Sequence, residues 1–320
     1  MYLLNLAISA KTISHSSLSV SFFTHRVYAE TNNATWPYFY LPKYESYAGD
    51  YKTLSRAEFV GVNNIVEHDD REEYINWATQ HYKTWLEESH LVAYGNLDKL
   101  NPDPTKYNEF ISKKTADGFF PDDDREYYSV RTTYSPPARA YGPITNLNIG
   151  VLGGNGALIE SLLLLKNETL VTTVRPFTAL PPDEHEGYHT DSSADNPHSF
   201  FYYPVHEVAQ DTNSKIVASL VSAVAWDASM LNLLPDNVNG IYCVIKNNCD
   251  QMYSYEIDGK DAYYRGDGDF HNTKYDEYEV VVDLSPHTHP EFELAPNHCT
   301  YSLVSAFPAL VGLFSDALEN

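Results

Sequence analysis

Short apolar runs separated by turn residues dominate the second half of the chain, and this pattern predicts strands. The runs at 216–226 and 241–245 are rich in β-branched and aromatic residues and are bounded by Asp, Asn and Gly. Between them, Asp227 can cap a helix of about two turns. The next pair, Asn239 and Gly240, tolerates positive φ and therefore suits a chain reversal. We expect an antiparallel sheet with a helix laid across it.

The first half of the chain predicts helices as well as strands. Asp69 and Asp70 can cap a helix, and acidic residues follow in its first turn. Aromatic side chains then recur along one face of this helix: Tyr74, Trp77, His81 and Trp85. Nearer the N-terminus, apolar residues spaced by seven predict a long helix over 1–32. Its narrow apolar stripe suits either the seam of a homodimer or an ordinary packed helix.

Longer blocks of the sequence resemble one family. The block AVAWDASMLNLLPDNVNGIYCVIKNNCDQMYSYEIDG, followed by YEVVVDLSPHTHPEF and HCTYSL, resembles the region outside the membrane in receptor-type guanylate cyclases of diatoms, a CHASE-like sensor. The earlier stretches NNATWPYFYLPKYE, DDREEYINWATQHYKTWL and SPPARAYGPITNLN are similar to that family in the same order. The resemblance runs from Ser17 to Leu303, and LLPDNVNGIYCVIKN is its most specific part.

Together, the pattern and the resemblance predict an α+β fold, with a long N-terminal helix followed by two PAS-like sensor domains. The expected order is an N-terminal helix at 1–32, a membrane-distal domain at 33–180, a polar linker at 181–199, a membrane-proximal domain at 200–304 and an atypical tail at 305–320. The resemblance also implies a position on the extracellular face of a membrane and signalling to a cyclase domain outside this chain. The same order of elements occurs in many α+β domains, so the fold by itself does not fix the function.

Charge and composition narrow the possible partners. Asp and Glu total 44 against 21 Lys and Arg, which gives a formal net charge of −23. Because this charge repels phosphate backbones, we expect no nucleic-acid partner. No stretch of the sequence reaches the roughly 18 apolar residues that a membrane helix needs. The 26 tyrosines suit half-exposed sheets and binding surfaces.

The sequence contains no recognisable catalytic or cofactor motif. Glycines at 150–156 precede a predicted helix at 155–166, but their spacing fits neither G-x-G-x-x-G nor the P-loop. Histidines gather in the linker and in a later turn, without an HExxH or Cys-x-x-Cys pattern to support a metal site: His185, His189 and His198, then His287 and His289. We therefore predict no enzyme activity, cofactor or metal. Two alternatives stay open, namely a divergent hydrolase that uses the linker histidines and Asp191, and a secreted binding or adhesion module.

The resemblance places a small ligand in the membrane-distal domain, between Trp36 and Phe177. In that span, five side chains near predicted strand ends combine hydrogen-bond donors, acceptors and an aromatic face: Arg131, Tyr134, Ser135, Asn146 and Asn148. We predict that these residues contact the ligand, and the alternative is that they cap loops.

The cysteines and two sequons indicate whether the protein lies inside or outside the cell. Cys243 lies in a predicted strand and Cys249 follows two asparagines that readily turn the chain, so we predict a disulfide between them. Cys299 would be left over, although the odd count also permits either of the others to pair with it. A buried, reduced Cys243 is the competing interpretation. Asn33 and Asn167 begin N-x-Thr sequons, which suit glycosylation outside the cell.

Overall fold

The computed structural model of the chain describes residues 35–100, 110–115, 117–135, 137, 146–149, 170–172, 193, 195–208, 211–232, 234–283, 299 and 301–306. Several predicted features lie outside these residues. They are the helices at 1–32 and 155–166, the sequons at Asn33 and Asn167, and most of the linker at 181–199.

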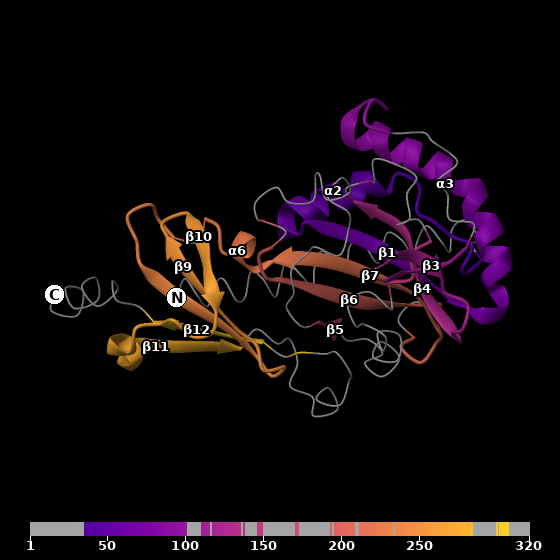
Figure 1. The fold of residues 1–320 in the computed structure, drawn as a ribbon. Helices are drawn as coiled ribbons and strands as arrows, with labels where there is room; N and C mark the ends of the chain where they lie inside the picture. The colour runs from indigo at the N-terminus through magenta and orange to yellow at the C-terminus, as the bar shows by residue number, and fades with distance from the viewer. Residues whose placement is uncertain are drawn as a thin grey trace.

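The first sheet has five antiparallel strands in the order β4-β1-β7-β6-β5 (Figure 1). The strands are β1 (Phe59–Glu67), β4 (Tyr127–Ser135), β5 (Leu170–Val171), β6 (His198–His206) and β7 (Ile216–Ala225). Nearly every residue of β1 and β7 is buried, whichever way its side chain points. Both faces of this sheet are therefore covered.

Helices α2 (Tyr44–Ser55) and α3 (Arg71–Tyr94) supply much of that cover. The aromatic face predicted after Asp70 is confirmed, because α3 follows a single 3₁₀ turn, η1 (His68–Asp70), and packs against the side of β1 that carries Phe59. Helix α2 packs with Val60 and Val62, which alternate with Phe59 and so point to the opposite face.

The second sheet also has five antiparallel strands, in the order β10-β9-β8-β12-β11. The strands are β8 (Ile241–Asn247), β9 (Met252–Asp258), β10 (Asp261–Asp267), β11 (Glu279–Asp283) and β12 (Tyr301–Ala306), with the 3₁₀ helix η4 (Thr273–Tyr278) before β11. Figure 1 shows this sheet beside the first one, with the short helix α6 (Trp226–Ser229) near the junction. A separate hairpin joins β2 (Ser112–Thr115) to β3 (Gly118–Pro121).

The second sheet buries one face more than the other. Ile241, Cys243 and Ile245 of β8 form a core with Tyr255 and Leu303. Along β10, by contrast, exposed and half-buried residues alternate from end to end. This is the pattern of a sheet with one face in solvent.

A short strand connects the two sheets. β5 pairs with β6 in the first sheet, through Leu170 and Val171. The side chain of Val171, however, packs in the core of the second sheet. Its carbonyl oxygen also accepts a hydrogen bond from the backbone N–H of Cys299, at 2.8 Å.

The predicted fold class, an α+β fold with a long N-terminal helix and two PAS-like domains, is wrong. The described residues are mainly antiparallel β-sheet, with three sheets and only three α-helices among them. The helix expected across the second sheet from Asp227 shrinks to the four residues of α6. The physical reason lies in the next residues, because Asn232 adopts a left-handed φ of 57° and Pro235 cannot donate a helical hydrogen bond. The positive φ expected near Asn239 and Gly240 is found at Gly240, at 73°, but the turn itself lies just before them, where the Val238 N–H donates to the Pro235 carbonyl at 3.0 Å.

Strands β6 and β7 fall on the other side of the expected boundary. The sequence pattern grouped residues 200–225 with the second half of the chain, after a linker at 181–199. In the structure β7 pairs with β1 in the first sheet, with Phe59 opposite Ala223 and Gly61 opposite Val221. The chain passes from the first sheet to the second over residues 226–240.

The predicted disulfide between Cys243 and Cys249 is wrong, since Cys249 pairs with Cys299, with the Cα atoms 5.8 Å apart. Cys243 is fully buried in β8 and takes no part in the bridge. The position of Cys243 in β8 explains why the predicted disulfide is wrong. Four residues of strand, roughly 13 Å, separate it from the turn that begins after Asn247, and a disulfide cannot span that distance.

Candidate ligand-binding site

An aromatic pocket opens between α3 and the chain segment before α2. Its empty volume is about 180 Å³, part of it open to solvent, and it is lined by Tyr40, Trp77, Ala78, His81, Tyr82, Trp85 and Thr132. Five of these residues come from α3 at spacings of three and four, which places them on one helix face. The rings of Trp77 and His81 stack with centroids 5.0 Å apart, and the ring of Tyr40 lies 6.1 Å from that of His81.

A β-bulge in β4 shapes the inner wall of this pocket. The register between β1 and β4 runs from Val62 opposite Thr133 to Asn63 opposite Arg131, so Thr132 is an extra residue without a partner in β1. A bulge of this kind can turn two successive side chains toward the same face. Thr132 lines the pocket, and its hydroxyl lies 3.4 Å from that of Tyr74 on α3.

The side chain of Arg131 points into the apolar core between the first sheet and α3. Its guanidinium carbon lies 4.5 Å from the ring centroid of Phe59 and 5.2 Å from that of Tyr134. The backbone is held on both sides, because its N–H donates to the Leu147 carbonyl at 3.1 Å and its own carbonyl accepts from the Tyr82 hydroxyl at 3.1 Å. The backbone at this position is therefore fixed, and only 4% of the residue is exposed.

The side chain of Arg131 has no hydrogen-bond partner for its Nε and Nη1 atoms within the described part of the chain. Two neighbouring groups share this condition. The amide of Asn63, opposite Arg131 on β1, keeps Oδ1 without a partner while Nδ2 donates to Ser219 at 3.4 Å. The indole Nε1 of Trp85 is also without one, and the Trp85 ring packs edge-on against Tyr134 at 5.2 Å.

These unpartnered groups form a polar cluster inside an apolar core. Buried side-chain polar atoms almost always have a hydrogen-bond partner, and a local group of exceptions calls for an explanation such as a bound molecule. Three are donors, on Arg131 and Trp85, and one is an acceptor, on Asn63. We call Arg131, Asn63 and Trp85 the Arg131 cluster. The cluster adjoins the aromatic pocket, because its member Trp85 lines that pocket and so does Thr132, the residue after Arg131 in β4.

Three of the five predicted ligand contacts meet near this cluster. Arg131 is a member of it, and the ring of Tyr134 lies under the guanidinium. Asn146 is connected through Tyr82, whose hydroxyl lies 3.0 Å from Asn146 Oδ1. Burial raises the pKa of Tyr82 well above its ordinary value, so this hydroxyl remains a donor at neutral pH.

Ser135 lies apart from the cluster. Its hydroxyl donates a 2.7 Å hydrogen bond to Oε1 of Glu45 on α2, on the opposite side of the sheet. Burial raises the pKa of Glu45 to about 7, against a small opposing effect of the Ser135 hydrogen bond. Ser135 was predicted to contact the ligand, but its side chain faces away from the Arg131 cluster.

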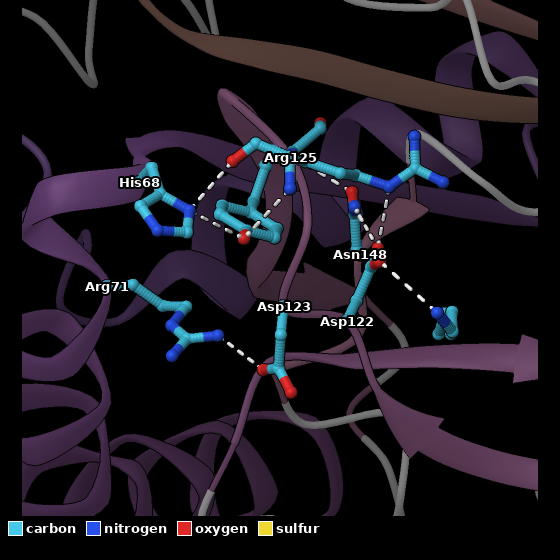
Figure 2. A network of polar contacts seen from close by, with 9 residues as sticks. His68, Arg71, Asp122, Asp123, Arg125 and Asn148 are labelled. Atoms are coloured by element: carbon cyan, nitrogen blue, oxygen red, sulfur yellow. Dashed lines mark hydrogen bonds and ion pairs between the residues drawn. The ribbon is translucent and has the colours of Figure 1, made fainter.

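Asn148 belongs to a structural network rather than to the cluster (Figure 2). Its amide nitrogen donates to the buried carboxylate of Asp122 at 2.9 Å, and its amide oxygen accepts from the backbone of Ser129 at 3.0 Å. Arg125 and Lys113 contact the same carboxylate, at 2.8 and 3.7 Å. Asn148 thus makes the loop-fastening contacts that the alternative prediction described.

The same network ties the loop after β3 to the start of α3. Figure 2 shows Arg71 paired with Asp123. His68 lies above them, with Nδ1 3.0 Å from the carbonyl oxygen of Arg125. These contacts hold the loop on the η1 turn and so fix where α3 begins.

His198 is the one predicted histidine among the described residues. It is fully buried at the start of β6, with Nε2 2.7 Å from Oε2 of Glu58 and Nδ1 2.6 Å from the carbonyl oxygen of Asn196. The Asn196 side chain donates in turn to Asp227 at 2.6 Å. His198 is therefore part of the core, not of an exposed linker. In the described residues, no group of three His, Cys, Asp or Glu side chains could hold a metal ion.

Sequence reasoning did not assign Asn63 and Trp85 to the site. Asn63 had a usable signal, because Asn63 and Asn64 interrupt an otherwise apolar strand in FVGVNNIVE. Trp85 was predicted on the aromatic face of α3 but was assigned no further role. Both need the strand pairing and the position of α3 before they can be placed beside Arg131.

No protein-family model matches this chain, and no curated protein matches it. Within the described ranges, no helix is long and apolar enough to cross a membrane.

Proposed function

We propose that this chain is a sensor region that binds a small ligand between α3 and the first sheet. The observation that supports it best is the buried Arg131 beside an aromatic pocket, with two nitrogen donors that have no partner among the described residues. A buried charge without a counter-charge costs several kcal/mol, which is about as much as many domains have in total stability. Such a cost is reasonable where a ligand supplies the missing contacts.

The resemblance to the sensor region of diatom receptor-type guanylate cyclases supports the wider setting of this proposal. In that setting the chain lies on the extracellular face of a membrane and reports ligand binding to a cyclase domain outside this chain. A disulfide between Cys249 and Cys299 agrees with an oxidising compartment. The chain itself then binds and signals, and the catalytic step belongs to the cyclase domain.

A thermal-shift screen of small metabolites tests the ligand-binding proposal. Ala78 is buried and lines the pocket, so Ala78→Leu fills it with three extra carbon atoms. The matched control is Leu91→Met, on an exposed part of the same helix. We expect at least one compound to raise the Tm of the wild type and of the control, and to have little effect on Ala78→Leu. Circular dichroism establishes that both variants are folded.

Two outcomes would contradict the proposal. One is that no compound raises the Tm of the wild type. The other is that every active compound stabilises Ala78→Leu as much as the control, which would place binding elsewhere on the chain.

A further inference from the structure

The Arg131 cluster presents a particular set of hydrogen-bonding groups to a ligand. Arg131 offers Nε and Nη1, and Trp85 offers Nε1, so three donor nitrogens lack an acceptor within the described part of the chain. The rings of Phe59 and Tyr134 face the guanidinium, but an aromatic face cannot accept its in-plane hydrogen bonds. The missing partner is therefore an anion or another strong acceptor.

Among anions and strong acceptors, a carboxylate group fits these three donor nitrogens best. The unpartnered Nε and Nη1 lie on different edges of the planar guanidinium, and a carboxylate oxygen can accept a charge-assisted hydrogen bond from either. The two oxygens of a carboxylate can also divide between two residues, here Arg131 and Trp85, which both contact Tyr134. A neutral amide would leave the arginine charge buried without a counter-charge.

Asn63 adds a second requirement. Its Oδ1 atom is a buried acceptor that has no partner in the ranges the structure describes, directly across the strand pair from Arg131. A ligand that carries a hydroxyl or amino group beside its carboxylate would donate to this oxygen. A plain carboxylate would leave the oxygen unsatisfied, and a buried unsatisfied acceptor weakens binding.

The aromatic pocket limits the rest of the ligand. Much of its empty space is open to solvent, so the enclosed part has room for no more than a small group such as a methyl. The walls are apolar ring faces from Trp77, Tyr82 and Trp85, so a small apolar group fits them better than a charged one.

We infer that the ligand is a small carboxylate with a hydrogen-bond donor next to its carboxyl group, held by Arg131, Trp85 and Asn63. This inference rests on the proposed function, because it names the ligand class of the same site. The hydroxy acids and amino acids both meet the description, and lactate and alanine represent the two sources.

Isothermal titration with four probes of similar size tests the inference on the wild-type chain. The probes are lactate, alanine, propionate and propionamide. We expect lactate or alanine to bind best, propionate about 10-fold more weakly because Asn63 is unsatisfied, and propionamide about 100-fold more weakly than propionate. Stronger binding of phosphate or chloride than of lactate and alanine would overturn the carboxylate assignment.

Variants assign the contacts. Arg131→Met should abolish the preference for propionate over propionamide, and Arg131→Lys should retain part of it, because lysine keeps the charge but not the planar donors. Trp85→Phe should weaken all three carboxylates about 10-fold, and Asn63→Leu should make lactate no better than propionate. Arg265→Met, an exposed arginine on β10, is the control and should change none of these values.

The two proposals fail in different ways. If the metabolite screen finds ligands but Arg131→Met binds them as well as the wild type, the carboxylate inference is wrong and the sensor proposal stands. If the screen finds none, the sensor proposal itself is wrong. Should Arg131→Met fail to fold, the comparison of propionate with propionamide on the wild type decides the ligand class alone.

Discussion

The two five-stranded sheets of this protein differ in how many of their faces are buried. The first sheet has both faces covered, and it contains buried polar atoms without a partner in the described residues, on Glu45, Asn63, Trp85 and Arg131. The second sheet buries one face of mainly apolar side chains, and Tyr255 is its one residue with such an atom among those described. The comparison separates a sheet whose surroundings hold several buried polar atoms without a partner from a sheet whose buried face is almost wholly apolar.

Each sheet accordingly has a different source of stability. The second sheet has a smaller core, and a disulfide between Cys249 and Cys299 holds the β8–β9 turn to the residues just before β12. The first sheet has two large clusters of buried side chains, one on each face. Its interior can tolerate polar groups because the surrounding apolar burial is large. The experiments below test this difference, in order of decreasing effect.

Removing the disulfide should have the largest effect. The bridge spans 50 residues, and the loop-entropy relation gives a loss of about 4 kcal/mol in the free energy of unfolding for the double variant Cys249→Ser, Cys299→Ser. Urea unfolding under non-reducing conditions measures it. The control is Cys243→Ala, which removes a buried sulfur but keeps the bridge and should cost about 1 to 2 kcal/mol. Equal midpoints for the double variant and the wild type would mean that the second sheet does not depend on the bridge.

Removing the imidazole of His198 should destabilise the first sheet by about 3 kcal/mol, since deleting one partner of a buried hydrogen bond costs roughly 1 to 3 kcal/mol. The reason is that Glu58 loses a 2.7 Å contact in a site with no access to water. Thermal unfolding of His198→Ala measures the loss. A double variant with Glu58→Gln should lose less than the sum of the two single changes. Additive losses would show that the two side chains do not interact.

Glu45 should make the stability of the first sheet depend on pH. Burial raises its folded pKa to about 7, above the ordinary value of 4.5, so the folded protein binds more protons between these values than the unfolded chain. Stability therefore falls as pH rises from about 4.5 to about 7, by about 2 kcal/mol after allowance for the remaining exposure. Urea unfolding at pH 5 and pH 8 should show this loss in the wild type. Glu45→Gln keeps an acceptor for Ser135 and should remove it, whereas an unchanged pH slope would contradict the assignment.

Arg131→Met should have the smallest effect and the opposite sign. Replacing a buried charge by an apolar side chain of similar length is often neutral or stabilising, so the ligand-free protein should gain about 1 kcal/mol. Denaturant unfolding without added carboxylate measures the gain, with Arg265→Met as the unaffected control. A loss of more than about 2 kcal/mol would indicate that Arg131 serves the structure of the core rather than a ligand.

Local signals in the sequence predicted local structure well. The acidic residues after Asp70 and the aromatic spacing on α3 predicted that helix, and the Asn-Gly pair predicted the positive φ of Gly240, because each depends on neighbouring residues alone. Membership of a sheet depends on distant residues. The run at 216–225 shows its strand character but not that it pairs with β1, more than 150 residues earlier in the chain.

The site was predictable to the same limited degree. Arg131, Tyr134 and Asn146 were chosen as polar or aromatic residues near strand ends, and they do lie close together. Asn148 and Ser135 met the same criterion but face other partners. The bulge at Thr132 decides which side chains share a face, and a bulge of one residue leaves no mark in the hydrophobic pattern.

The strand β5 gives the two sheets a mechanical connection. Its backbone pairs with β6 at the edge of the first sheet, while Val171 packs in the other core and accepts a hydrogen bond from Cys299. The disulfide then joins Cys299 to Cys249, which lies in the turn between β8 and β9. Because packed interiors resist compression, a shift of this edge strand by an ångström is passed to the β8–β9 turn rather than absorbed. The short β5 segment is therefore one path by which a shift in the first sheet reaches the second, beside the packing of Phe201 and Trp226 against the second core.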